Sequence, residues 1–429
     1  MIETLKNAWK IVDIRKKIFF TIFIIILFRI GAVIPVPFID YTALKNSISS
    51  TGSQANDFFN YLSVLTGGGL EYGAIFAMSV TPYINSSIII QLLTVVITPW
   101  QRWAEQGEEG RKKLAQVTRY ATVILGLIQA GAYYYYLQAN NFVSVTGGAK
   151  IFAAFVIILT LTAGSAIVMW LGEQIDVKGI GNGISILLFA GILSRAPQAA
   201  TSLWNAAFKL NQAPAVLAII LIFLVMVTFI VWMTNAERRI PIQYAKRVVG
   251  RKQYGGQNTH IPIKVNMSGV LPIIFASSIL MLPTMLLSFG LFKTNSTAYK
   301  LMSLFSVRGV FYAIIYFALI IAFAYFYVSI QYNPIEMANS LRKNSGAIPG
   351  IRPGKPTSDF IARIISRITL IGAIFLGIIA ILPIFVGQVG QINLSIGGTS
   401  ILIIVGVALD TVQNLESQMM MRHYKGFLD

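Results

Sequence analysis

Ten long apolar stretches, separated by loops whose positive charge falls almost entirely on one side, dominate this chain of 429 residues. About 20 residues of helix cross a hydrocarbon core, and most of the stretches reach that length. A chain that is 55% hydrophobic and only 12% charged does not have the composition of a soluble domain. The sequence therefore predicts an all-α polytopic membrane protein. The predicted spans are 18–38, 73–97, 119–138, 151–172, 184–204, 214–234, 268–290, 309–331, 368–388 and 398–417.

The lysines and arginines indicate the orientation of the spans. When they are counted loop by loop, 26 lie on the side that carries both termini and seven lie on the opposite side. Cytoplasmic loops are the ones enriched in Lys and Arg, so both termini are predicted to be cytoplasmic. The polar, basic residues 1–17 lead directly into a full span, and we expect no cleaved signal peptide. The absence of cysteine excludes disulfides and thiolate chemistry.

Ten spans divide naturally into five plus five. The predicted halves are residues 1–205 and residues 206–429, with the break in an external loop. Because each half has an odd number of spans, the second half enters the membrane from the opposite side. Halves of similar fold would then form an inverted repeat about an axis in the membrane plane.

Two cytoplasmic loops, about 235–267 and 332–367, are long and basic. The first contains two stretches of alternating polar and apolar residues around a glycine-containing turn, which predicts a β-hairpin in the cytosol. The second contains GAIPGIRPGKPT, whose prolines and glycines predict a stiff, exposed loop. Basic loops can set topology, bind anionic lipid head groups, or dock a partner with an acidic surface. The length of these two loops favours docking.

Two further segments are unusual for a membrane protein. The apolar stretch 58–65 is too short to span, and three glycines follow it, which predicts a half-helix that re-enters protein-lined space. The next span carries Pro82 and a group of polar residues that includes Asn85 and Gln91. Such polar side chains either mediate helix packing or line a water-filled path or an opening seam.

Enzyme chemistry finds little support in the sequence. The two histidines, His260 and His423, lie in loops, so no Ser–His pair can form at membrane depth. Neither an HExxH motif nor a P-loop is present. Arg29 and Asp410 are the main charges within spans, and such sparse charge disfavours a coupled transporter without excluding it. No catalytic residue, metal site or cofactor is predicted.

Several long motifs, in order along essentially the whole chain, resemble the SecY family of channel-forming subunits of the bacterial protein translocase. The motifs are FRIGAVIPVPFID, TPYINSSIIIQLLTVV, MWLGEQIDVKGIGNGISILLFAGI, ERRIPIQYAKRVVGRK, THIPIKVNMSGVLPIIFASSI, NPIEMANSLRKNSGAIPGIRPGKPT and GGTSILIIVGVALDTV. The resemblance implies a protein-conducting channel of two five-helix halves in a bacterial plasma membrane. Such a channel passes unfolded secretory polypeptides across the membrane, releases transmembrane segments sideways into lipid, and has no enzymatic activity of its own.

The resemblance also implies four groups of site residues in this chain. The apolar pore ring would comprise Val80, Ile84, Ile184, Leu188, Ile274 and Ile403. The plug, within about 57–72, would comprise Phe58, Phe59, Tyr61, Leu62, Val64, Leu65, Gly67, Gly68 and Gly69. The polar lateral-gate residues would be Asn85, Gln91 and Asn266. The partner-docking residues would be Lys246, Arg247, Arg251, Lys252, Arg352 and Lys355.

The partners implied by the resemblance are small SecE-like and SecG-like membrane subunits, the motor ATPase SecA, the ribosome, polypeptides that bear a signal sequence, and membrane lipids. Two alternatives come from other classes of protein. One is a secondary transporter for a small molecule, and the other is a non-conducting insertase or docking scaffold.

Overall fold

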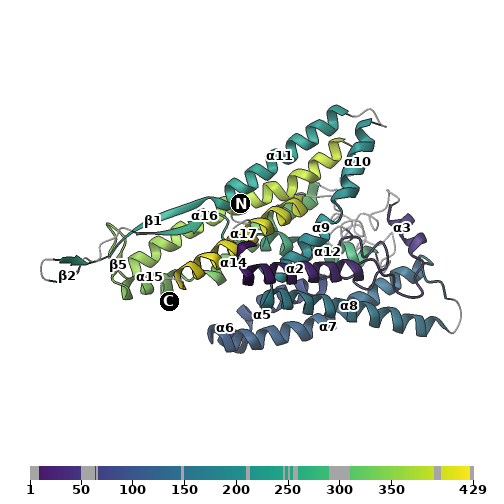
Figure 1. Cartoon of the computed structure of the whole chain (residues 1–429), viewed down its shortest axis with the longest axis horizontal. Coiled ribbons are helices and arrows are strands. Elements are labelled where there is room, and N and C mark those ends of the chain that lie inside the picture. The colour runs from purple at the N-terminus through teal and green to yellow at the C-terminus, as the bar shows by residue number, and fades with distance from the viewer. Residues whose placement is uncertain are drawn as a thin grey trace.

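The computed structural model describes residues 9–49, 63, 66–145, 149–208, 213–244, 247–249, 252–254, 259–288, 310–390 and 398–425. Helices dominate these residues, and a narrow β-hairpin projects from one end of the helical body (Figure 1). Each of the ten predicted spans overlaps a described helix. Six described helices are long and apolar enough to cross a membrane, and a seventh is obtained if the bent pair α5 and α6 counts as one span.

The first half of the chain packs around helix α8. This helix contacts α2, α7 and α9, and α7 also packs along α5. Leu137, Ile157 and Leu161 lie fully buried in the core between α7 and α8. The helices of this half are α2 (Val12–Gly31), α3 (Tyr41–Ser49), α5 (Thr81–Val96), α6 (Thr98–Glu105), α7 (Glu108–Ala139), α8 (Ala149–Lys178), α9 (Gly183–Leu193) and α10 (Ala196–Phe208).

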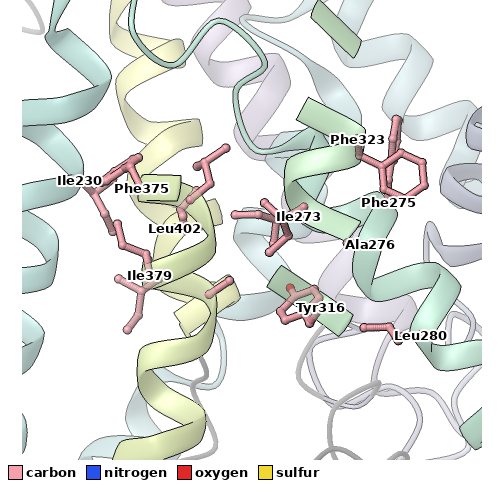
Figure 2. Close-up of a cluster of buried hydrophobic side chains, with 14 of the residues drawn as sticks. Ile230, Ile273, Phe275, Ala276, Leu280, Tyr316, Phe323, Phe375, Ile379 and Leu402 are labelled. Carbon is pink, nitrogen blue, oxygen red and sulfur yellow. The ribbon is translucent and has the colours of Figure 1, made fainter. Parts of the chain in front are cut away.

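The second half is built around an apolar and aromatic core. Figure 2 shows this core, in which Phe275 and Phe323 meet edge to face with ring centroids 5.9 Å apart. Phe375 makes a similar contact with Phe229 at 5.2 Å. Edge-to-face pairs of this kind add to the stabilisation from buried area. The helices of this half are α11 (Ala213–Asn235), α12 (Leu271–Ser288), α14 (Val310–Gln331), α15 (Pro334–Lys343), α16 (Lys355–Gly390) and α17 (Gly398–Lys425).

Helices of the two halves contact each other at several places. Helix α17 of the second half packs against α9 of the first, and α12 packs against α5. The direct chain connection runs through α10 and α11, which also contact each other. Helix α11 buries little of its surface within the chain, so its apolar side chains are available to lipid or to another subunit.

The predicted β-hairpin is confirmed. Strand β1 (Glu237–Tyr244) pairs antiparallel with β4 (Thr259–Lys264), with Ile240 opposite Ile261. The short strands β2 (Arg247–Val249) and β3 (Lys252–Tyr254) pair at the tip. The alternation of the strand buries Ile240 and Ile242 against the hydrophobic core near the cytoplasmic end of α16.

The second long basic loop, about 332–367, is more ordered than the sequence predicted. Its first part forms α15, and β5 (Gly346–Ala347) then adds a third strand to the hairpin beside β1. Helix α16 already begins at Lys355, because Pro356 is compatible with the first turn of a helix. The irregular part of this loop is therefore limited to residues 348–354, and Ile348 at its start is buried. Strands β4, β1 and β5 form one sheet that joins the two basic loops, whereas β2 and β3 form a separate two-stranded sheet.

The predicted second span is wrong at its start. Residues 66–80, which we call the stem, form a buried series of turns, and helix α5 begins only at Thr81. Helical structure is unfavourable here because Gly67, Gly68 and Gly73 have positive φ angles. The stem also lies close to α8, since a Cβ atom at Gly164 would be 2.1 Å from the Ile75 carbonyl oxygen. At its other end, α5 turns by 106° into α6.

Candidate pore ring, gate and docking surface

All six residues predicted for the pore ring belong to one hydrophobic cluster. They come from the stem, α5, α9, α12 and α17, so both halves of the chain contribute. The buried members are Val80, Leu188 and Ile403, and the half-buried ones that pack against the cluster are Ile84, Ile184 and Ile274. Ile184 also packs against Gly172 of α8, so this side chain is only partly available to a central constriction.

The side chains of this cluster are aliphatic or aromatic. Water and ions are excluded from an aliphatic constriction by dewetting. The contacts within it are non-directional, so side chains can repack around an object that passes between the two halves.

The predicted gate residues lie near the second contact between the halves. Asn85 is on α5, and Asn266 precedes α12, the helix that packs against α5. The Oδ1 atoms of both residues are buried without a hydrogen-bond partner within the described structure. Asn266 also lies beside Gly372 of α16, which places its backbone inside the second half. Gln91 is half-buried further along α5.

The predicted plug is described only in part. Its glycines, Gly67, Gly68 and Gly69, are buried in turns of the stem. The remaining predicted plug residues are Phe58, Phe59, Tyr61, Leu62, Val64 and Leu65, and they lie outside the described residues.

Charged side chains contact the stem and hold it in place, and the sequence interpretation did not identify this role. Arg29 Nη1 donates a hydrogen bond to the Gly67 carbonyl at 3.0 Å. Arg195 forms a buried ion pair with Glu71, with 2.6 Å between Nη2 and Oε1. The sequence did contain one indication of this ion pair. Glu71 and Arg195 carry opposite charges in a part of the chain that has few charges.

Arg352 and Lys355, two of the predicted docking residues, are exposed. Gly350 and Gly354 flank Arg352 with φ angles of +81° and +108°, and Thr357 Oγ1 donates to the Arg352 carbonyl at 2.8 Å. This turn therefore presents the guanidinium on a defined backbone. The strands β2 and β3 carry two more predicted docking residues, Arg247 and Lys252. Lys246 and Arg251 lie outside the described residues.

An open groove of about 690 Å³ separates the hairpin from α15. Apolar Ile261 and Met337 line it together with polar His260, Glu336 and Asn344. The groove therefore lies beside the β1–β4 pair of the hairpin.

The base of the hairpin is linked to both helices that carry second-half ring residues. Lys264 Nζ donates to Gln413 Oε1 of α17 at 2.8 Å. The chain then runs from β4 directly into α12. On the first-half side, Lys17 Nζ donates to Gln418 Oε1 of α17 at 3.1 Å. The C-terminal part of helix α17 therefore has hydrogen bonds to both halves of the chain.

Taken together, the apolar helices define a multi-pass membrane protein whose two halves share one hydrophobic cluster and which carries a basic hairpin at one end. A sequence profile of the SecY family matches residues 74–412. The chain is 44% identical to protein translocase subunit SecY of Bacillus subtilis over 439 residues, with all of both chains covered. It is 42% identical to the protein of that name from Streptomyces scabiei over 443 residues, again with full coverage of both.

Solved structures agree on the fold. The structure described as that of a protein conducting channel has a TM-score of 0.62 at 18% identity, covering 94% of this chain and 92% of that one. Sec61 in the canine ribosome-channel complex has a TM-score of 0.58 at 17% identity, with the same coverage. The chain belongs to the SecY family. This assignment confirms the predictions of a translocation channel and of a protein without catalytic activity.

Proposed function

We propose that this chain crosses a bacterial plasma membrane ten times, with both termini in the cytosol, and that an unfolded polypeptide passes between its two inverted halves. The main support for a path between the halves is the hydrophobic cluster that contains all six predicted ring residues. Five separate segments from both halves contribute these residues. At rest the ring blocks ions. During transport its side chains repack around the polypeptide, and residues 57–72 act as the plug on the external side.

The contact between α5 and α12 is the proposed lateral gate. When the halves separate along this contact, an apolar signal sequence or transmembrane segment can move from the channel into lipid. Burial of apolar area at roughly 25 cal/mol per Å² can drive that step. Asn85 and Asn266 support the proposal because buried polar atoms without partners weaken a closed contact and favour its opening. Gln91 would extend the polar line along α5.

The basic sheet is the proposed docking surface for SecA or for the ribosome, both of which present acidic surface or phosphate. Its links to α12 and α17 support a coupling role, since a partner that moves the hairpin also moves the helices that carry Ile274 and Ile403. Structural relatives include a Sec61 channel and a yeast Ssh1 complex, each described in complex with a ribosome. SecE-like and SecG-like subunits and membrane lipids would cover the exposed apolar helices.

Reconstitution in liposomes tests this function. The chain is combined with SecE-like and SecG-like subunits, SecA, ATP and an unfolded precursor with a signal sequence, and protease protection of the precursor is measured. We expect protection that Arg352→Glu lowers about tenfold or more, since charge-assisted contacts contribute about 1.5–3 kcal/mol each. Arg352→Lys keeps the charge but loses the bidentate geometry, so its loss should be smaller.

The wild-type protein tests the channel function, and Arg352→Glu tests the docking role of Arg352. Wild-type protein that gives no protection with an active motor contradicts the channel function. Full protection with Arg352→Glu leaves the channel in place and contradicts the docking role of Arg352.

A further inference from the structure

Helix α17 has one face toward each half of the chain (Figure 1). It contacts α9 of the first half and both α11 and α16 of the second. Ile401 and Leu402 are buried in the core of the second half. Ile403 and Val407 are buried in the cluster that contains residues of α8 and α9. The helix therefore lies on the boundary along which the two halves could move relative to each other.

The turn between α8 and α9, residues 179–182, contacts the face of α17 that points toward the first half. Gly181 has a φ angle of +72°, and a Cβ atom there would lie 3.5 Å from Thr411 Oγ1. The turn is fixed to the first half, because the Gly183 amide donates a hydrogen bond to Asp176 Oδ1 at 2.7 Å. A rigid part of the first half thus packs directly on α17.

A second contact with the first half lies nearer the C-terminal end of α17. Leu415 is buried in one cluster with Ile14 of α2 and Ile180 of the turn, and their exposed fractions are 3%, 2% and 3%. Beside them, Lys17 Nζ donates to Gln418 Oε1 at 3.1 Å. Movement of α17 away from this contact would expose three apolar side chains to water, which is unfavourable.

The residues of α17 that make these contacts lie on one face of the helix, because residues three or four apart are neighbours on a helix surface. The stripe comprises Ile403, Val407, Thr411, Asn414, Leu415 and Gln418. It extends about 22 Å along the helix at a rise of about 1.5 Å per residue. The contact between α5 and α12 is different, because Asn85 and Asn266 near it have buried Oδ1 atoms without a partner in the described part of the chain.

We propose that α17 is the pivot of channel opening. The helix turns in place against α2 and residues 179–182 while the contact between α5 and α12 opens. Apolar contacts are non-directional, so the stripe can keep its partners during a small rotation. On another side of the helix, the bond from Lys264 to Gln413 lets the hairpin turn it. This inference rests on the proposed function, because it assumes that the two halves separate during transport.

Cross-linking across each contact tests the pivot in the full complex with cysteine-free small subunits. The chain contains no cysteine, so a bifunctional thiol reagent joins only introduced pairs. Lys17→Cys with Gln418→Cys joins α2 to α17 at the pivot. Ile88→Cys with Ala276→Cys joins α5 to α12, because both residues belong to one buried cluster. We expect both pairs to cross-link at rest. The pivot cross-link should leave precursor protection unchanged, and the α5–α12 cross-link should abolish it.

The same double variants without reagent give the baseline for protection. Loss of protection with the pivot cross-link, or failure of that pair to cross-link, overturns the pivot and leaves the channel function standing. Full protection with both cross-links contradicts the separation of the halves, and therefore both the proposed function and the pivot.

A second measurement does not require transport. Gly181→Val adds two methyl groups at the contact with α17, the helix that carries Ile403 of the ring. Gly107→Val is the matched control, since Gly107 has a φ angle of +73° and no atom within 4 Å of its Cβ position. Overpacking should make resting ion conductance about 5- to 150-fold higher in Gly181→Val than in the control. Equal conductance would show that the turn does not position α17 and would overturn the pivot.

Discussion

Replacing Leu188 by asparagine is expected to make the resting channel leak ions. Leu188 is 5% exposed and packs in the same cluster as Val80 and Ile403. An amide in that position costs about 1–3 kcal/mol if it stays dry, which corresponds to roughly 5- to 150-fold more of the hydrated, conducting form. Single-channel recording in planar bilayers without precursor measures this fraction directly.

A control substitution of equal volume distinguishes ion leak caused by a polar side chain from ion leak caused by poorer packing. Leu188→Ile keeps an aliphatic side chain of the same volume, and such swaps usually cost less than about 1.5 kcal/mol. We expect its resting conductance to stay near that of wild type. Equal conductance in Leu188→Asn and wild type would show that Leu188 does not contribute to the seal.

Deletion of residues 248–256 at the hairpin tip is expected to abolish partner-driven translocation. The deletion removes β3 and most of β2 but leaves every pair of the β1–β4 register intact. It also leaves the Lys264–Gln413 contact in place. The deleted residues include two basic side chains, Arg251 and Lys252. Losing their charge-assisted contacts at about 1.5–3 kcal/mol each should lower SecA-driven precursor protection at least tenfold, with little change in thermal stability.

The same deletion distinguishes a protein-conducting channel from a small-molecule transporter. A transporter binds its substrate between its spans and should work without the hairpin tip. Loss of translocation in the deletion variant, together with an unchanged melting temperature, supports docking at the tip. Translocation at the wild-type rate would show that the partner binds elsewhere.

The membrane class, the helices and the hairpin could be predicted because their signals are local. A span is recognised from about 20 apolar residues, and a hairpin from alternation around a turn. The start of α5 could not be predicted in this way, because Ile75 and Phe76 are as apolar as the residues of a span. What makes this part irregular is the left-handed backbone at the glycines and the close approach of α8. Strand β5 was missed because two residues carry no periodic pattern.

The site residues depended on the family resemblance rather than on periodicity. Val80 and Ile403 resemble dozens of other aliphatic residues in this sequence, and only the fold shows that they share one cluster. The Glu71–Arg195 pair joins positions 124 residues apart, so no local pattern could reveal it. Their opposite charges in an apolar chain were the only sequence signal.

Disulfide cross-linking to an arrested polypeptide tests the central claim most directly. The chain contains no cysteine, so each introduced cysteine is the only one available. Ile403→Cys and Leu188→Cys place it in the ring on the two halves, whereas Leu221→Cys places it on the exposed side of α11. A precursor with one cysteine in its arrested segment should cross-link to both ring positions and not to position 221. Cross-linking at position 221 but at neither ring position would contradict a path between the two halves.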